Sequence, residues 1–155
     1  MDAGFKVPVS TLVVVYTPDL EVLLIERADR PGYWQSVTGS QEPGETLAAT
    51  AAREVGEETG IEAARHELRD WRVSNVYEIY PIWRHRYAPG VTHNTEHVFG
   101  LRLPGRVDIR LAPQEHTRHR WLPWQAAAGE VFSWSNREAI LMLPEKDAPR
   151  PRRTP

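Results

Sequence analysis

Three glutamates lie close together in this sequence at a spacing that could bind metal ions. Glu54, Glu57 and Glu58 stand at positions i, i+3 and i+4, so on a helix all three carboxylates share one face. At that spacing they repel each other unless they are solvated or hold cations. Carboxylate oxygens suit hard divalent cations, so Mg²⁺ or Mn²⁺ fits such a site in a chain without cysteine. The alternative is an acidic, solvent-exposed helix with Arg53 as an ion-pair partner.

A helix that carries these glutamates is predicted from about Thr46 to Thr59. Thr46 suits the N-cap position, and Gly60 suits the left-handed residue that closes a helix. Apolar residues recur at four-residue spacing and predict a narrow buried stripe, formed by Leu47, Ala51 and Val55. The sequence therefore predicts a helix with one face on a core and another face carrying carboxylates.

The whole stretch Gly39–Ile61, which reads GSQEPGETLAATAAREVGEETGI, resembles the signature of the Nudix hydrolase superfamily at every constrained position. The resemblance implies a loop–helix–loop metal site that hydrolyses a nucleoside diphosphate linked to another group. It also implies an α/β fold, in which a mixed β-sheet is sandwiched between α-helices. Gly39 is expected to keep the loop tight beside the carboxylates.

Three stretches outside this signature are similar to one branch of the superfamily, the bacterial dihydroneopterin triphosphate diphosphatases. They are WQSVTGS at Trp34–Ser40, RHRYAPGVTHNTE at Arg84–Glu96 and SWSNREAI at Ser133–Ile140. The resemblance implies conversion of 7,8-dihydroneopterin triphosphate to dihydroneopterin monophosphate and pyrophosphate in folate biosynthesis. Two alternatives stay open. One is hydrolysis of ordinary or damaged nucleoside triphosphates or of dinucleoside polyphosphates, and the other is a non-catalytic Nudix binding module.

The resemblance also implies which residues act in catalysis. It implies Mg²⁺ held by Glu54, Glu58 and Glu115, the last from a polar loop far along the chain. One carboxylate must stay free to accept the proton of the attacking water. Glu57 is the candidate on the helix, with Glu115 as the alternative, and Arg53 is expected to pair with a glutamate and fix its rotamer.

A further set of residues matches positions expected to contact substrate. These are Lys6, Arg27, Thr38, Tyr77, Glu78, Ile79, Tyr80 and Ser133. On the residues alone, Lys6 and Arg27 would be either surface cations or phosphate contacts, and the Thr38 hydroxyl would either touch substrate or make a structural hydrogen bond. The segment Tyr77–Tyr80 would form either a groove for a flat ring or an aromatic edge of the core.

Composition limits the class of protein. The 155 residues predict one domain, at 1–146, followed by a flexible Pro- and Arg-rich tail at 147–155. A net charge of −2 gives no general argument for binding nucleic acid or an anionic membrane. No apolar run approaches the roughly 20 residues that a membrane span needs, so a cytoplasmic location is expected. The oligomeric state is left open.

The remaining elements follow from apolar and β-branched runs. Strands are predicted at Val7–Tyr16, Val22–Arg27, Tyr33–Thr38, Leu68–Tyr80, Tyr80–Tyr87, Asn94–Leu103, Val107–Leu111 and His119–Leu122. Helices are predicted at Pro123–Val131 and Ser135–Leu143. Ser135 with Glu138 matches a capping box for the second of these helices, in which Ile140, Leu141 and Leu143 would face the core.

Overall fold

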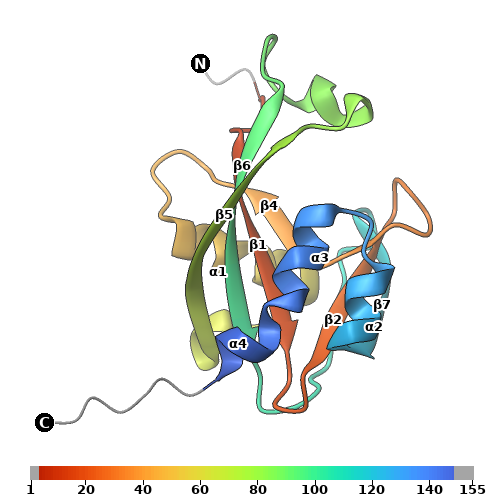
Figure 1. Ribbon diagram of the computed structural model, residues 1–155. Helices are drawn as coiled ribbons and strands as arrows, with labels where there is room; N and C mark the ends of the chain where they lie inside the picture. Colours follow the sequence, from red (N-terminus) through yellow and green to blue (C-terminus); the bar gives the residue numbers. More distant parts are fainter. Residues whose placement is uncertain (1–3, 149–155) are drawn as a thin grey trace, which may run out of the picture.

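Two apolar strands form the centre of the structure, a computed structural model that describes residues 4–148 (Figure 1). Strands β1 (Val9–Tyr16) and β2 (Glu21–Arg27) form a hairpin and pair antiparallel at Tyr16 and Val22. Seven of the eight residues of β1 are buried. An apolar run without polar alternation is typical of a strand that is covered on both faces.

The seven strands within residues 4–148 belong to one mixed sheet. Its path is β3-β2-β1-β6-β5, while β4 pairs with β1 and β7 pairs with β2. Only the β1–β6 pair is parallel among the pairs of named strands in the described residues. The further strands are β3 (Trp34–Gln35), β4 (Val37–Ser40), β5 (Glu67–Glu78), β6 (His93–Arg102) and β7 (His116–Pro123).

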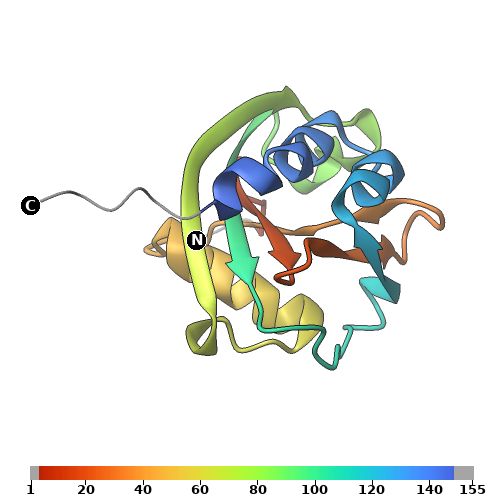
Figure 2. The same cartoon turned by 60° about the horizontal axis from the view of Figure 1, so that its bottom comes forward.

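Helices cover both faces of this sheet, as the α/β/α expectation required. The helices are α1 (Leu47–Thr59), α2 (Trp124–Glu130), α3 (Trp134–Leu141) and α4 (Leu143–Asp147), with 3₁₀ turns η1 (Ala63–Arg65) and η2 (Pro81–Arg86). Figure 2 shows α1 on one side of the sheet and α2–α4 on the other. Two buried clusters fill the layers. The α1 side holds Val13, Val15, Val55, Phe99 and Leu101, and the other side holds Leu12, Val14, Val98, Ile140 and Leu143.

The strand predicted at Tyr33–Thr38 is divided in two at Ser36. The Ser36 backbone N–H donates to Oδ1 of Asn136 at 2.8 Å, and Asn136 Nδ2 donates to the Ser36 hydroxyl at 2.9 Å. These bonds replace sheet pairing at that residue. The chain then joins β1 as β4, which brings Gly39 opposite Thr11 and leads directly into the loop before α1.

The strand predicted at Tyr80–Tyr87 is wrong, because this segment forms η2. Pro81 occupies the first turn of the 3₁₀ helix. Proline has no N–H to donate to a ladder and its fixed φ suits a helical turn, so it ends β5 rather than interrupting a longer strand.

The strand predicted at Val107–Leu111 is also absent from the described residues. The segment is irregular and runs beneath α1, where Val107, Ile109 and Leu111 are partly buried against the core. Its apolar alternation therefore reflects packing against a helix. A backbone bond from Arg110 N–H to the Thr59 carbonyl, 2.8 Å long, ties it to the end of α1.

The N-cap of helix α3 lies two residues before the predicted one. Ser133, not Ser135, is its N-cap, and the Ser133 hydroxyl accepts from the Asn136 N–H at 3.2 Å. Ser135 is instead buried inside the helix. Of the residues expected in the core, Ile140 and Leu143 are buried but Leu141 is exposed, because the helix ends at Leu141 and the chain turns there into α4.

The start of the predicted flexible tail is corrected as well. Asp147 ends α4, and its Oδ1 accepts hydrogen bonds from the Tyr16 hydroxyl at 2.9 Å and from Arg102 Nε at 3.1 Å. These contacts anchor the last helix to β1 and β6. The rest of the predicted tail, residues 149–155, lies outside the described residues.

Candidate active site

Helix α1 places the three glutamates as the sequence predicted. The Thr46 hydroxyl caps it by accepting from the Ala49 N–H at 3.1 Å, and Gly60 closes it in the left-handed region with φ 76°. Ala51 and Val55 are fully buried against the sheet. The opposite helix face therefore points away from the core and carries its carboxylates toward the loop after β4.

Arg53 ties that loop to the helix. Its Nε and Nη2 donate to the two carboxylate oxygens of Glu45 at 2.7 and 3.0 Å, and Nη2 also donates to the Ser40 carbonyl at 3.0 Å. The remaining nitrogen, Nη1, donates to Glu54 at 2.7 Å and contacts Glu57 at 3.3 Å. Arg53 holds the pKa of Glu45 down at about 2. The pairing expected of Arg53 is thus present, and its bidentate partner is Glu45, a residue to which sequence reasoning gave no role.

Gly39 is the residue against which the Glu54 carboxylate packs. A Cβ atom at position 39 would lie 2.0 Å from Glu54 Cδ and 2.2 Å from Glu54 Oε1. Only glycine leaves room for the carboxylate in this position. The close approach agrees with the tight loop expected from the sequence.

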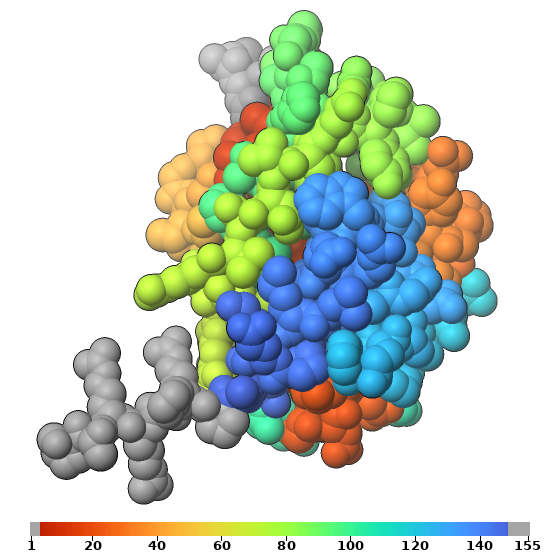
Figure 3. All heavy atoms as spheres, viewed as in Figure 1, coloured from red at the N-terminus to blue at the C-terminus, as the bar shows by residue number. Residues whose placement is uncertain are grey.

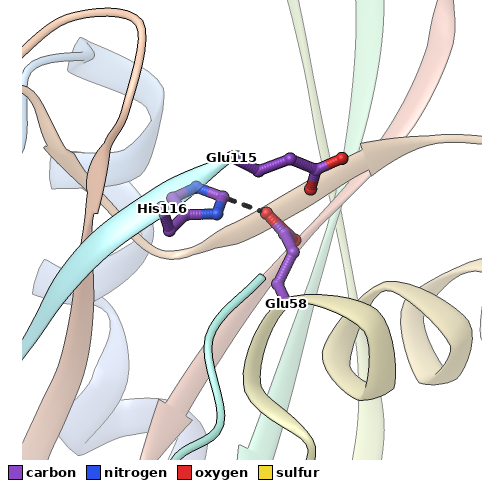
Figure 4. A group of neighbouring side chains, drawn as sticks. All are labelled: Glu58, Glu115 and His116. Atoms are coloured by element: carbon purple, nitrogen blue, oxygen red, sulfur yellow. Dashed lines mark ion pairs between the residues drawn. The ribbon is translucent and has the colours of Figure 1, made fainter. Parts of the chain in front are cut away.

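Glu58 is buried and faces Glu115, in the loop before β7, and His116, the first residue of β7. Its Oε2 accepts from the Thr38 backbone N–H at 3.2 Å, and its Oε1 lies 3.6 Å from His116 Nε2. Figure 4 shows Glu58 of α1 pointing toward Glu115 and His116. One ligand atom from each of the three lies within 4.8 Å of the others. The loop carboxylate expected at Glu115 is therefore beside the helix carboxylates.

The electrostatics of this group favour a bound cation. Burial, together with the carboxylates of Glu57 and Glu115 and against the effect of Arg53, raises the pKa of Glu54 to about 7. The pKa of Glu58 is raised well above its ordinary value by burial, then by Glu54 and Glu115. Buried carboxylates that repel each other are stabilised by a divalent cation. The donor set of carboxylate oxygens fits a hard ion such as Mg²⁺ or Mn²⁺.

The geometric grouping differs in one member from the expected ligand set. It joins Glu58 and Glu115 with His116, while Glu54, whose Oε1 is held by Arg53, is outside it. Burial, followed by the nearby Arg27 guanidinium, lowers the pKa of His116 to about 4, so its ring is neutral near pH 7. A neutral imidazole can bind a metal or donate to a carboxylate. The only sequence signal for His116 is that it follows Glu115.

One cavity of about 670 Å³ runs alongside this cluster. It is lined by every predicted site residue, which are Lys6, Arg27, Thr38, Arg53, Glu54, Glu57, Glu58, Tyr77, Glu78, Ile79, Tyr80, Glu115 and Ser133. The fold thus brings together residues from the N-terminus, the signature helix, β5, the loop before β7 and the start of α3. A volume of this size accommodates a small-molecule ligand.

Several of the predicted substrate residues are held by partners in the protein. Arg27 donates to Asp29 at 2.8 and 3.0 Å, and its guanidinium lies 4.4 Å from the centroid of the Trp83 ring. Burial, followed by the nearby Arg86, lowers the pKa of Lys6. The hydroxyl of Ser133 is engaged as the cap of α3. These contacts position a group of cations and one hydroxyl at the cavity wall.

Aromatic rings from the segment after β5 and from the residue before Ser133 line one side of the cavity. Tyr80 stacks on Trp83 with centroids 5.3 Å apart, and both rings meet Phe132 edge-on at 6.0 and 5.8 Å. In the space-filling view, the yellow-green β5–η2 region lies against the blue α3 (Figure 3). Trp83 and Phe132 had no predicted role, because an aromatic residue in sequence does not reveal whether it faces a cavity.

Sequence reasoning also missed a buried polar group at the cavity wall. Glu96 and Asn94 of β6 are 3% and 1% exposed and line the cavity. They stand two residues apart on a strand, which suggests a shared face but not burial.

No helix within residues 4–148 combines the length and apolar character needed to cross a membrane.

Comparisons with known proteins agree with this geometry. The profile of the NUDIX domain matches residues 6–143. The chain is 48% identical over 142 residues to the dihydroneopterin triphosphate diphosphatase of Escherichia coli K12, which covers 90% of this chain and 93% of that protein. It is 38% identical over 136 residues to the Haemophilus influenzae protein of the same name, covering 84% of each. The solved structure of the E. coli dihydroneopterin triphosphate pyrophosphohydrolase superposes with a TM-score of 0.83 at 49% identity, covering 88% of this chain and 94% of that one.

Proposed function

The chain belongs to the Nudix hydrolase family, and we propose that it converts 7,8-dihydroneopterin triphosphate to dihydroneopterin monophosphate and pyrophosphate. The observation that carries this proposal is the continuous cavity that joins the carboxylates of α1 to a buried polar end beneath α3. Two relatives with this named activity, at 48% and 38% identity, support the choice of substrate.

The acidic end of the cavity suits the phosphates together with a divalent cation. Glu54, Glu58 and Glu115 are the proposed ligands of Mg²⁺, and His116 lies close enough to Glu58 to join or orient them. When bound, Mg²⁺ would neutralise phosphate oxygens and make both water and phosphorus more reactive. Glu45, through Arg53, keeps the loop and helix at the separation that these ligands need.

Cationic side chains at the cavity wall would hold the rest of the triphosphate. Lys6, Arg27 and Arg86 all line it, and phosphate oxygens accept charge-assisted hydrogen bonds from such groups. Holding the chain of phosphates extended would present the bond to be broken beside the carboxylates, which lowers the entropic part of the barrier.

The hydrolysis needs one group to take a proton from water. Water adds to phosphorus, the bridging P–O bond breaks, pyrophosphate leaves, and the water proton passes to a carboxylate. Glu57 is the proposed acceptor because it lines the cavity, its side chain is 56% exposed, and its contact with Arg53 is a weak 3.3 Å. Glu115 is the alternative acceptor.

The proposal also implies a binding partner and a cellular location for the protein. The partner is the small-molecule triphosphate alone, and neither nucleic acid nor membrane is required. We place the reaction in the cytoplasm, in the synthesis of folate, because a chain with no cysteine suits a reducing compartment.

A substrate panel tests the proposal. We expect kcat/KM with Mg²⁺ to be at least tenfold higher for dihydroneopterin triphosphate than for GTP, ATP or a dinucleoside tetraphosphate. Equal or lower values for the pterin would favour the alternative nucleotide substrates and reject it. Glu58→Gln should lose at least 100-fold in kcat, whereas the exposed Glu62→Gln, a matched change just past α1, should retain activity. Full activity of Glu58→Gln would contradict the proposed metal site, and a wild-type protein inactive on every compound would favour the binding module.

A further inference from the structure

A buried polar group beneath α3 has no role in the hydrolysis itself. Glu96 and Asn94 lie on the face of β6 that is turned toward α3, and both line the cavity. Only 3% of Glu96 and 1% of Asn94 is exposed. A carboxyl group buried this deeply usually has a cation as partner.

Glu96 has no such cation among the described residues. Groups that affect its pKa are the hydroxyls of Ser135 on α3 and Tyr77 on β5, whose hydrogen bonds only partly offset the effect of burial. By contrast, the buried Glu26 is bonded to Arg118. Glu96 is therefore not part of a structural ion pair, and its Oε1 has no hydrogen-bond partner within residues 4–148.

Asn94 is held in one orientation and presents a second free acceptor. Its Nδ2 donates to the Ser10 hydroxyl at 2.8 Å and to the Tyr77 hydroxyl at 3.1 Å. The Tyr77 hydroxyl donates its own proton to Glu96, so it can only accept from Asn94, and this places the amide nitrogen on the Tyr77 side. Asn94 Oδ1 has no hydrogen-bond partner in the described part of the chain.

The two free acceptors are neighbours. Residues i and i+2 of a strand lie on one face, about 7 Å apart, and the Asn94 amide and the Glu96 carboxyl group both bond to the same Tyr77 hydroxyl. Buried acceptors left without donors are costly, so a site like this is completed by a molecule that brings N–H groups.

We propose that Glu96 Oε1 and Asn94 Oδ1 read the pyrimidine edge of a 2-amino-4-oxo heterocycle, an inference that rests on the proposed function and assigns its ring-specificity residues. That edge carries a 2-amino group beside an N3–H, which gives adjacent donors for two acceptors. A 2,4-dioxo ring places a carbonyl oxygen where the 2-amino group would be, so it opposes the carboxylate. Adenine has no such pair of donors on this edge.

The ring alone tests this recognition without hydrolysis. Binding of neopterin, which has no phosphate, would be compared with binding of its 2,4-dioxo analogue by titration calorimetry at pH 8 with EDTA present. A matched set of hydrogen bonds to a ring edge discriminates by roughly 10- to 100-fold. We expect wild type to prefer neopterin by at least tenfold and Glu96→Gln to reduce that preference to less than threefold.

A matched control is Glu67→Gln, the same change at an exposed position on β5. It should keep the wild-type preference. No preference in wild type, or an unchanged preference in Glu96→Gln, would overturn the proposal and leave water as the partner of both acceptors. Thermal unfolding of each variant checks that the fold is kept, and Asn94→Asp, which adds a charge beside Glu96, should also weaken neopterin binding.

Measurements with two nucleotide substrates distinguish a failure of the ring assignment from a failure of the proposed function. GTP and ITP differ only in the 2-amino group, so wild type should have a higher kcat/KM for GTP and Glu96→Gln should not. If that holds while dihydroneopterin triphosphate is not preferred, the ring assignment stands and the proposed function fails. If dihydroneopterin triphosphate is preferred but Glu96→Gln leaves the ratio of GTP to ITP unchanged, the ring assignment alone fails.

Discussion

Replacing Gly39 with alanine should disable catalysis while leaving the fold intact. The added Cβ would lie 2.0 Å from Glu54 Cδ, and its nearest neighbours are atoms of that one carboxylate. Carbon atoms pack at about 3.5 Å or more, so the Glu54 carboxylate must move by roughly 1.5 Å. It is a side-chain end rather than backbone, so the clash is relieved by displacing it from Arg53 instead of by unfolding.

A shift of this size is large on the scale of catalysis. Misplacement by about 1 Å can cost on the order of 100-fold in rate. We therefore expect Gly39→Ala to lower kcat about 100-fold and to raise the Mg²⁺ concentration needed for half-maximal activity. Pyrophosphate release measured across a series of Mg²⁺ concentrations gives both values.

Gly105→Ala is the matched control. A Cβ at Gly105 would meet no atom within 4 Å, so this variant should retain wild-type kinetics. The double variant gives a sharper result. If the alanine acts through Glu54, then Gly39→Ala should cause little further loss in a Glu54→Ala background. Wild-type kcat and Mg²⁺ dependence in Gly39→Ala, or fully additive losses in the double variant, would refute the reasoning.

Two further predictions concern an ion pair and a buried carboxyl group. The lysine in Arg53→Lys cannot make the bidentate bond to Glu45 while also reaching the Ser40 carbonyl. We therefore expect kcat at saturating Mg²⁺ to fall about 10- to 100-fold. An unchanged kcat would show that Arg53 is not needed to hold the loop and the helix together for catalysis. Burial raises the pKa of Glu96 from its ordinary value to about 7, so between these two values the proton binds the folded chain more tightly than the unfolded chain. The free energy of unfolding of wild type, relative to Glu96→Gln, should therefore fall by up to about 3 kcal/mol as pH rises from about 4.5 to 7. Urea unfolding of both proteins at pH 5 and pH 8 measures this difference, and a pH-independent difference would show that the carboxyl group is not protonated at pH 5.

The signature helix could be predicted because its signals are local. Thr46, the apolar stripe and Gly60 lie within one short stretch, and each acts on the backbone beside it. The same holds for the crowding of the three glutamates, which follows from helix geometry alone. The sequence therefore predicted α1 within one residue at its start.

The elements that were mispredicted depend on contacts between distant residues. Ser133 and Ser135 are both suitable caps by composition, and the choice is made by Asn136, which must reach Ser36 a hundred residues earlier. Starting α3 at Ser135 would turn that side chain away from β3 and β4. Nothing near the serines in sequence carries this requirement.

Burial of polar residues was the least predictable part of the site. Glu96 stands in a strand whose neighbours include His97 and Thr95, so its pattern suits a solvent-facing position equally well. Its burial comes from α3, which covers this face of the sheet 40 residues later in the chain. His116 likewise becomes part of the site only when β7 pairs with β2.

Burying the carboxylates of Glu54 and Glu58 together has a cost that links the site to stability. Glu58 is only 2% exposed, and the contacts to its oxygens are one backbone N–H and a neutral His116 among the residues described. Two such groups destabilise the folded chain when both are charged. A divalent cation that binds the folded chain alone removes this repulsion and adds RT ln(1 + [ion]/Kd) to its stability.

The folded protein should therefore melt at a higher temperature with Mg²⁺ than with EDTA. At an ion concentration 100-fold above Kd the gain is about 2.7 kcal/mol, or roughly 5 to 10 °C for a chain of this size. Glu58→Gln removes a buried charge, so in EDTA it should melt at or above the temperature of wild type. It should gain little from Mg²⁺, so with Mg²⁺ it should melt below wild type. Glu62→Gln, an exposed change of the same kind, should keep the wild-type shift at matched ionic strength. If Mg²⁺ shifts Glu58→Gln as much as wild type, the stabilising ion binds elsewhere, and the crowding of carboxylates on α1 is not what the cation relieves.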